Sequence, residues 1–235
     1  IDKADMLAWT TAQLVTLTTE QISSLLTKQI FNLTTGQIPG LTTVQVRSLT
    51  TEQFAAFETR DMLAWETAQI SSLSTEQVSS LTTEQINAIG TTQISPLSTR
   101  QFSSLTTEQL ISIAPAKVPA WSTKQLISLN TEQVSSLTTE QVINLETSQV
   151  ANLTTEQISF FSTEQVVTFT KIQIPSFITI QLLAFTTEQI QSLTTLQTSN
   201  LSTNQLSRLT TEQLVAFDTS GFSSWTTDQI QSLST

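Results

Sequence analysis

An eight-residue repeat, free of insertions and deletions, runs along the whole chain and constrains its fold more than any other feature. From residue 5 to residue 229 one slot recurs every eight residues, giving 29 slots, and glutamine fills 25 of them. The exceptions are Asp5, Asp61, Lys117 and Gly221. A strict short period indicates one small unit stacked on copies of itself, so we expect a single continuous octapeptide-repeat solenoid over residues 1–235.

The positions within the octad differ in how strictly their residue type is kept. We number them from the glutamine, as in residues 77–84, and call them places one to eight. Place two is apolar in 28 of 29 copies and place five in all 29, which predicts a continuous apolar core. Place seven is threonine in 27 of 29 copies. Places three, four and eight vary, so we expect them to face outward.

The spacing of the constrained places fits a short helix. With an advance of about 100° per residue, places seven, one, two and five fall on one face. Place six is Ser, Thr, Asn or Asp in 22 of 29 copies, and the glutamine three residues later completes a capping box. We therefore predict an all-α fold, a solenoid of very short capped helices with one helix per octad.

A β-solenoid with eight-residue repeats is the alternative fold. Places five, seven and one also alternate with period two, as the inward-facing residues of a strand do. Pro39, Pro119 and Pro175 at place three would each remove an amide from a helix, which limits any helix to about a turn and a half. The helical prediction is preferred because it also explains places two and six.

A single octad cannot fold alone. Burying two aliphatic side chains contributes about 3 to 6 kcal/mol, whereas ordering eight residues costs about 12 kcal/mol. Stacking must supply the difference, and a buried carboxamide must find hydrogen-bond partners in a neighbouring copy. We therefore expect a structural ladder of side chains along the solenoid, represented by Gln21, Gln77, Gln85, Gln133, Gln141, Gln157, Thr19, Thr75, Thr83, Thr131, Thr139 and Thr155.

A weaker repeat of 56 residues, or seven octads, overlies the octad. The segment 5–9 (Asp-Met-Leu-Ala-Trp) recurs identically at 61–65 and more loosely at 117–121 and 173–177. One interpretation is that seven octads bring a special site round to the same side of a superhelix. The other is duplication of a seven-octad segment, with the aromatic residues at place five serving as core.

Composition excludes several classes of function. The net charge of −10 and the absence of a basic stripe argue against nucleic acid as a partner. No apolar run is long enough to span a bilayer. Without histidine, cysteine or tyrosine the chain lacks common catalytic bases, thiol nucleophiles and zinc ligands, so we expect no enzyme activity, cofactor or metal. Asp5 and Asp61, the acids expected at a buried place, are interpreted as tolerated variants or local caps.

The octads resemble a known kind of repeat. The runs at 73–86 and 137–145, of the form Leu-Thr-Thr-Glu-Gln-Val, are similar to octapeptide arrays in large bacterial secreted and surface proteins of adhesin type. They also resemble the Leu-Thr-Pro-Glu-Gln helix starts of the mesothelin and stereocilin group. The first resemblance implies an extracellular structural or adhesive role, and the second supports short capped helices.

The expected function is structural. We expect the subunit of an extracellular or cell-surface filament, or an adhesin stalk, that self-associates into a fibre through uncapped solenoid ends or lateral faces. The alternative is a binding module whose variable face recognises a protein or glycan. Residues 1 and 235 both fall inside the octad pattern, which is the reason for expecting uncapped ends.

Overall fold

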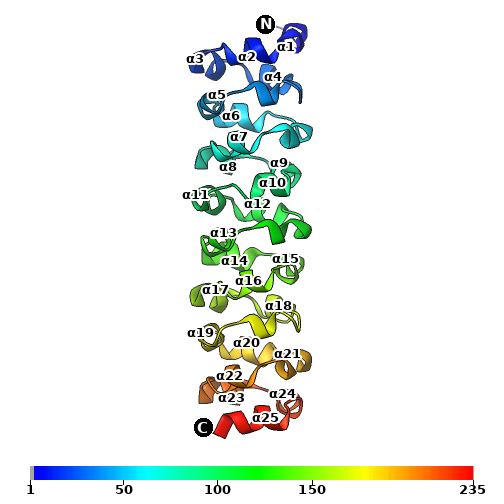
Figure 1. The fold of residues 1–235 in the computed structure, drawn as a ribbon, viewed down its shortest axis with the longest axis vertical. Helices are drawn as coiled ribbons and strands as arrows, with labels where there is room; N and C mark the ends of the chain where they lie inside the picture. Colours follow the sequence, from blue (N-terminus) through cyan, green and yellow to red (C-terminus); the bar gives the residue numbers. More distant parts are fainter. Residues whose placement is uncertain (1–2, 235) are drawn as a thin grey trace. The chain divides into compact units, whose positions relative to one another are not determined.

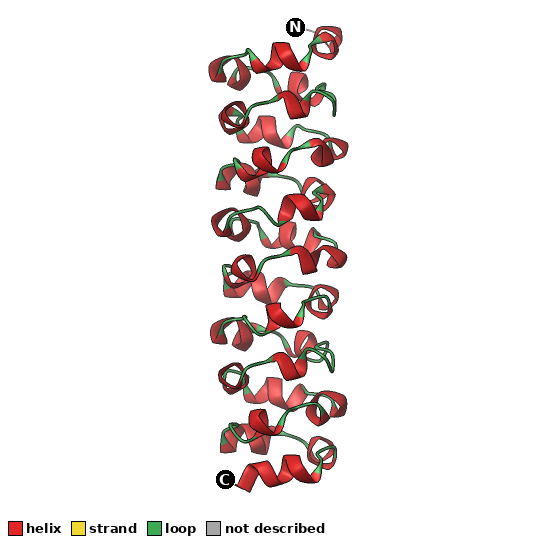
Figure 2. Cartoon of the chain, in the orientation of Figure 1, coloured by secondary structure: helices red, strands yellow, loops and turns green. Residues whose placement is uncertain are grey.

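The computed structural model describes residues 3–234, and these residues form short helices joined by short loops (Figure 2). No strand occurs among them. The predicted all-α fold with about one short helix per octad is therefore confirmed, and the β-solenoid alternative is wrong. The chain divides into two compact units, one up to Trp121 and the other from Ser122, each a solenoid of stacked helices (Figure 1).

The elements of the first unit follow one another at octad intervals. They are α1 (Lys3–Ala8), α2 (Thr11–Val15), α3 (Thr19–Ser23), α4 (Thr27–Phe31), η1 (Ile38–Gly40), α5 (Thr43–Ser48), α6 (Thr51–Ala55), η2 (Thr59–Ala64), α7 (Thr67–Ser71), α8 (Thr75–Ser80), α9 (Thr83–Ala88), α10 (Thr91–Ile94), α11 (Thr99–Ser103), α12 (Thr107–Ser112) and η3 (Pro115–Ala120), where η marks a 3-10 helix.

The second unit continues in the same manner. Its elements are α13 (Thr123–Ile127), α14 (Thr131–Ser136), α15 (Thr139–Ile143), α16 (Thr147–Val150), α17 (Thr155–Phe160), α18 (Thr163–Val166), η4 (Ile174–Ser176), α19 (Thr179–Leu183), α20 (Thr187–Ser192), α21 (Thr195–Ser199), α22 (Thr203–Leu206), α23 (Thr211–Ala216), α24 (Thr219–Ser223), α25 (Thr227–Gln231) and η5 (Ser232–Ser234).

Helix α8 shows why each octad forms one helix. Ser74 at place six is the N-cap, with extended backbone (φ −75°, ψ 164°), and its Oγ accepts a hydrogen bond from the Gln77 amide. In return, the Gln77 side-chain Oε1 accepts from the Ser74 amide at 2.9 Å. The helix ends where Leu81 at place five becomes extended again (φ −61°, ψ 142°). The predicted capping box therefore starts the helix, and place five ends it.

The prolines at place three lie in 3-10 helices. Pro39, Pro119 and Pro175 fall within η1, η3 and η4. A short 3-10 helix has fewer amides that must donate within it, so it tolerates a residue without an N–H group. The octads with proline at place three therefore keep a helical turn by forming a 3-10 helix instead of an α-helix.

Each turn of the solenoid contains a non-integral number of octads. Helices three octads apart pack together, as α12 does on α9 and α17 on α14. The glutamine side chains instead reach carbonyl groups in the octad four before their own, 28 to 31 residues earlier in sequence. One turn therefore holds about three and a half octads. The 56-residue repeat equals two turns, so Trp65 and Trp121 lie in one column of the first unit.

Places two and five form the core of both units. Place-two residues such as Phe54 and Phe102 are fully buried, and place-five residues such as Trp65 and Phe177 are nearly so. The Trp65 ring lies 5.0 Å from the Phe54 ring and 4.9 Å from the Phe57 ring, measured between centroids. Of the aromatic residues in the 56-residue repeat, Trp65, Trp121 and Phe177 thus pack within the core, whereas Trp9 is half-buried.

Place four does not face outward as the sequence pattern predicted. Residues such as Ser48 and Ala56 are half-buried, because place four lies against the helix start of the previous turn. The closest case is Gly40, where a Cβ atom would lie 2.7 Å from Thr11 Cβ, in an octad 29 residues earlier. This contact explains why most residues at place four are small.

The substitution Gly40→Ala tests this packing. We expect the variant to lose about 1–3 kcal/mol of unfolding free energy, because the added methyl group must push two turns apart. Gly36→Ala is the matched control, since its Cβ would meet only Thr34 Oγ1 at 3.9 Å. Urea unfolding of both variants measures the effect, and equal midpoints would contradict the close approach at Gly40.

Candidate functional site

The glutamine at place one bonds in two directions, and Gln77 illustrates both. Its Oε1 accepts from the Ser74 amide in its own helix. Its Nε2 donates to the Val46 carbonyl oxygen at 2.9 Å and to the Leu49 carbonyl oxygen at 2.8 Å. Gln77 is nearly fully buried, so these bonds form away from water. One carboxamide therefore starts a helix and ties it to the previous turn.

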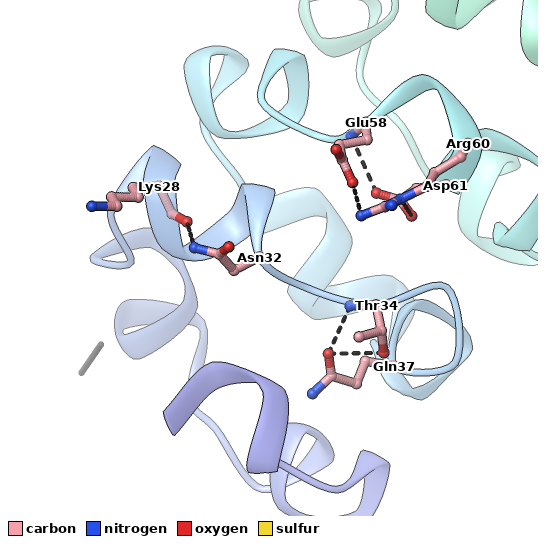
Figure 3. A network of polar contacts seen from close by, with 7 residues as sticks. All are labelled: Lys28, Asn32, Thr34, Gln37, Glu58, Arg60 and Asp61. Atoms are coloured by element: carbon pink, nitrogen blue, oxygen red, sulfur yellow. Dashed lines mark hydrogen bonds and ion pairs between the residues drawn. The ribbon is translucent and has the colours of Figure 1, made fainter. Parts of the chain in front are cut away.

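The same register recurs within each unit. The carboxamide Nε2 donates to carbonyl oxygens 28 residues earlier and, in addition, 30 or 31 residues earlier, which belong to places five, three and two. Figure 3 shows Gln37, whose Oε1 accepts from the amide and hydroxyl of Thr34. We call this set the glutamine ladder: Gln37, Gln45, Gln53, Gln69, Gln77, Gln85, Gln93, Gln101 and Gln109 in the first unit, and Gln157, Gln165, Gln173, Gln181, Gln189, Gln197, Gln205, Gln213 and Gln229 in the second.

The glutamines selected from the sequence lie in different surroundings. Gln77, Gln85 and Gln157 belong to the glutamine ladder. Gln133 and Gln141 are buried, and each side-chain oxygen accepts from the amide of its N-cap residue. Gln21 also accepts from its N-cap amide, but its side chain is exposed.

The threonines selected from the sequence occupy the first position of their helices and do not join the turns through their hydroxyls. Their side chains are exposed or half-buried, and among the described residues none of these hydroxyls bonds to another turn. This set comprises Thr19, Thr75, Thr83, Thr131, Thr139 and Thr155. Their preference has a different cause, because place seven packs on the small place-four residue of the following turn, as Thr11 does on Gly40.

Serine at place four makes a contact between turns that the sequence pattern did not reveal. Ser112 Oγ donates to the Thr83 carbonyl oxygen at 3.1 Å, 29 residues earlier, and to the Gln109 carbonyl oxygen in its own helix at 2.7 Å. Ser80 makes the equivalent bond to Thr51 at 3.4 Å. Frequent serine at place four was the available signal, but place four was predicted to face outward.

Two exceptions to glutamine differ in their effect on the ladder. Lys117 keeps a donor in the slot, since its Nζ donates to the carbonyl oxygens of Asn87 and Ile89, and burial lowers the pKa of its ammonium group. Gly221 has no side chain to offer, and its amide donates to Asp218 Oδ1 at 2.7 Å. The slot at residue 221 therefore retains the helix cap but not the bond to the previous turn.

Asp61 is the exception that places an acid in the ladder. Its side chain is fully buried, and its Oδ2 accepts from the Glu58 amide at 3.1 Å (Figure 3). Its Oδ1 has no hydrogen-bond partner. Burial raises the pKa of Asp61 above its ordinary value. The side chain of Asp5, expected at an equivalent place, lies outside the described residues.

The place-eight glutamates act at helix starts. The pKa of Glu84 is lowered because its carboxylate accepts from its own backbone amide and from the Thr82 hydroxyl. Such stabilisation is present above the ordinary glutamate pKa and is lost as pH falls through the lowered value. In residues 3–234 no three His, Cys, Asp or Glu side chains gather where they could hold a metal. Over the same residues, no helix is long and apolar enough to cross a membrane.

These features define an all-helical repeat protein whose turns are joined by a glutamine ladder. The family described as the ALTTAQ repeat matches the chain over residues 54–91. The matched segment includes Ala64–Gln69, which reads Ala-Trp-Glu-Thr-Ala-Gln. Among curated proteins, none has a sequence that matches the chain.

Proposed function

We propose that the protein is a structural element, the subunit of a filament or a stalk, in which turns of octads add to one another through the glutamine ladder. The observation that carries this proposal is the regular register of the ladder within each unit. Within each unit, ladder glutamines of one turn donate to carbonyl oxygens of the turn before it, as Gln109 does in the first unit and Gln165 in the second. A surface built in this way is complementary to a further copy of itself.

We propose that self-association uses residues exposed in the first and last described turns. Gln13 and Gln21 are exposed, and within residues 3–234 their Nε2 groups donate to no carbonyl oxygen. In the last described turn, the place-two residues Phe222 and Ile230 are 39% and 52% exposed, whereas internal place-two residues are buried. Exposed donors in one turn and exposed apolar residues in another are the groups through which a second copy of the chain would pack under this proposal.

We further propose an extracellular or cell-surface location and a role that is not enzymatic. Charged residues form only 12% of the chain, and serine and threonine supply much of the variable surface. Such a surface suits close packing between neighbouring fibres. Acidic side chains lie mostly at helix starts, where they stabilise the cap, so the chain offers little for catalysis.

Electron microscopy of the purified chain over a range of concentrations tests the filament proposal. We expect fibres of constant width that lengthen as concentration rises. The double variant Gln13→Ala/Gln21→Ala removes the exposed donors and should reduce fibre length while leaving the circular dichroism spectrum unchanged. Dispersed monomers at high concentration would refute the proposal, and unaltered fibres in the double variant would assign assembly to lateral faces.

A binding module is the second candidate, because aliphatic side chains are exposed at variable places. In the second unit Ile172, Ile178, Ile180 and Leu183 are between 43% and 67% exposed within twelve residues of sequence. Ile172 and Ile180 lie at place eight, Leu183 at place three and Ile178 at place six, and their exposure is the observation that favours this candidate. Replacing these four residues with threonine should abolish binding to a protein or glycan partner without affecting fibres, if recognition is the function.

A further inference from the structure

The acid at residue 61 occupies a position that elsewhere requires a hydrogen-bond donor. In the ladder register, the side chain at residue 61 should serve the carbonyl oxygens of Ile30 and Leu33, which precede it by 31 and 28 residues. Glutamine at the corresponding place donates to both carbonyls, as Gln69 does to Ile38 and Leu41. An ionised carboxylate can only accept, so it would face two carbonyl oxygens with no donor between them.

The two carboxyl oxygens of Asp61 are not equivalent. Oδ2 accepts from the Glu58 amide, which is the role of Oε1 in each ladder glutamine (Figure 3). Oδ1 is therefore the atom that corresponds to Nε2 of a ladder glutamine, and it has no hydrogen-bond partner. The side chain is fully buried, where an unpaired charge is costly.

We infer that Asp61 carries a proton on Oδ1 in the folded protein and that its loss weakens the ladder, making the first unit less stable as pH rises. A protonated carboxyl group donates from one oxygen and accepts at the other, as a carboxamide does. The side chain at residue 61 then offers one donor and one acceptor, as each neighbouring ladder glutamine does.

The charged groups near Asp61 do not remove this dependence on pH. Arg60 Nε lies 4.0 Å from Oδ1, but the Arg60 guanidinium also pairs with Glu58 and is 70% exposed. Glu58 opposes ionisation of Asp61. Among the elements packed on η2, α9 contributes Glu84 and η1 has no titratable residue, while Lys28 on α4 points its ammonium group away from Asp61 in Figure 3.

The direction of the pH effect follows from the raised pKa of Asp61. Below the ordinary aspartate value of 3.8, the residue is protonated in both the folded and the unfolded chain, and its stabilising contribution is complete. Above that pH the unfolded chain loses the proton first, so stability falls until the pH passes the folded pKa. Within this window each pH unit raises the ratio of unfolded to folded protein about tenfold through this one group.

Unfolding in urea at a series of pH values tests the inference with Asp61→Asn, which supplies an amide of nearly the same shape. We expect wild type and variant to have equal stability below the window, with the variant increasingly more stable as pH rises. Glu84→Gln, which removes an exposed charge on the adjacent α9, should show the opposite sign because the pKa of Glu84 is lowered. A difference between wild type and Asp61→Asn that does not change with pH would overturn the inference.

A direct measurement on the wild type keeps the inference testable if the variant does not fold. Aspartate labelled with ¹³C at the carboxyl carbon reports each titration by nuclear magnetic resonance. We expect one aspartate of the folded protein to titrate well above the others, and its signal to be the one absent from Asp61→Asn wherever that variant folds. Titration of every aspartate near its ordinary value would overturn the inference.

Discussion

Replacing Gln77 with alanine should lower the unfolding free energy by about 3–5 kcal/mol. The variant loses the two Nε2 bonds to Val46 and Leu49 and the Oε1 bond from Ser74, all in a buried site. Each net hydrogen bond contributes about 1 kcal/mol, and groups left unsatisfied together with the vacated space add the remainder. Urea unfolding followed by circular dichroism measures the loss.

Gln21 provides a matched control because its local sequence is nearly the same. Residues 19–24 read Thr-Glu-Gln-Ile-Ser-Ser, and residues 75–80 read Thr-Glu-Gln-Val-Ser-Ser. Among the described residues, the Gln21 side chain has only the cap bond, in which it accepts from the Thr18 amide, so Gln21→Ala should cost about 1 kcal/mol. Gln77→Glu retains the shape and the acceptor but replaces the donor, and should be as harmful as alanine at neutral pH and less so in acid. Equal losses for Gln77→Ala and Gln21→Ala would show that the ladder does not hold the turns together.

Replacing Phe54 with alanine should also cost about 3–5 kcal/mol, through loss of burial and creation of a cavity. Phe54 is fully buried at place two and packs on Trp65 and Phe57 of the core. Because Trp65 loses a ring partner 5.0 Å away, its fluorescence should change in the folded variant. Urea unfolding gives the energy, and the emission spectrum before unfolding gives the local effect.

Phe222→Ala is the control for Phe54→Ala, since Phe222 is the same residue type at the same place of the octad. Its side chain is 39% exposed, so less apolar surface leaves the core and a smaller cavity remains. We expect a loss of about 1–2 kcal/mol. If Phe222→Ala proved as harmful as Phe54→Ala, burial at place two would not be the source of the stability.

The fold was predictable because the octad carries its own signals for starting and ending a helix. The cap at place six, the glutamine three residues later and the apolar places two and five all indicated the same short helix. The division into two compact units was not predictable in the same way, because the octad phase continues unchanged through residues 121 and 122. Sequence periodicity predicts the repeating structural unit. The division of the chain into compact units depends instead on how densely residues pack along it, which the periodicity does not encode.

The pairing of the ladder could be predicted only in part. A buried glutamine such as Gln77 must bond to something, but its partners were fixed by the number of octads per turn, and the octad itself does not encode that number. The same missing number led to the wrong prediction for place four, because Gly40 meets Thr11 only after a full turn. Threonine is frequent at place seven because it packs between turns and begins the helix. Its frequency alone does not distinguish these causes from hydrogen bonding between turns, which is the role that the sequence analysis assigned to it.

The half-integral turn has a consequence for how such a chain can change in length. Within each unit a helix packs on the helix three octads before it, while its glutamine bonds to the octad four before it, so neighbouring turns are staggered. Gain or loss of a single octad keeps the type of each contact between turns, because every octad offers the same places, but it rotates all later residues of that unit to another side of the stack. Gain or loss of seven octads restores their azimuth, so only such changes preserve a surface on which side chains from different turns must act together.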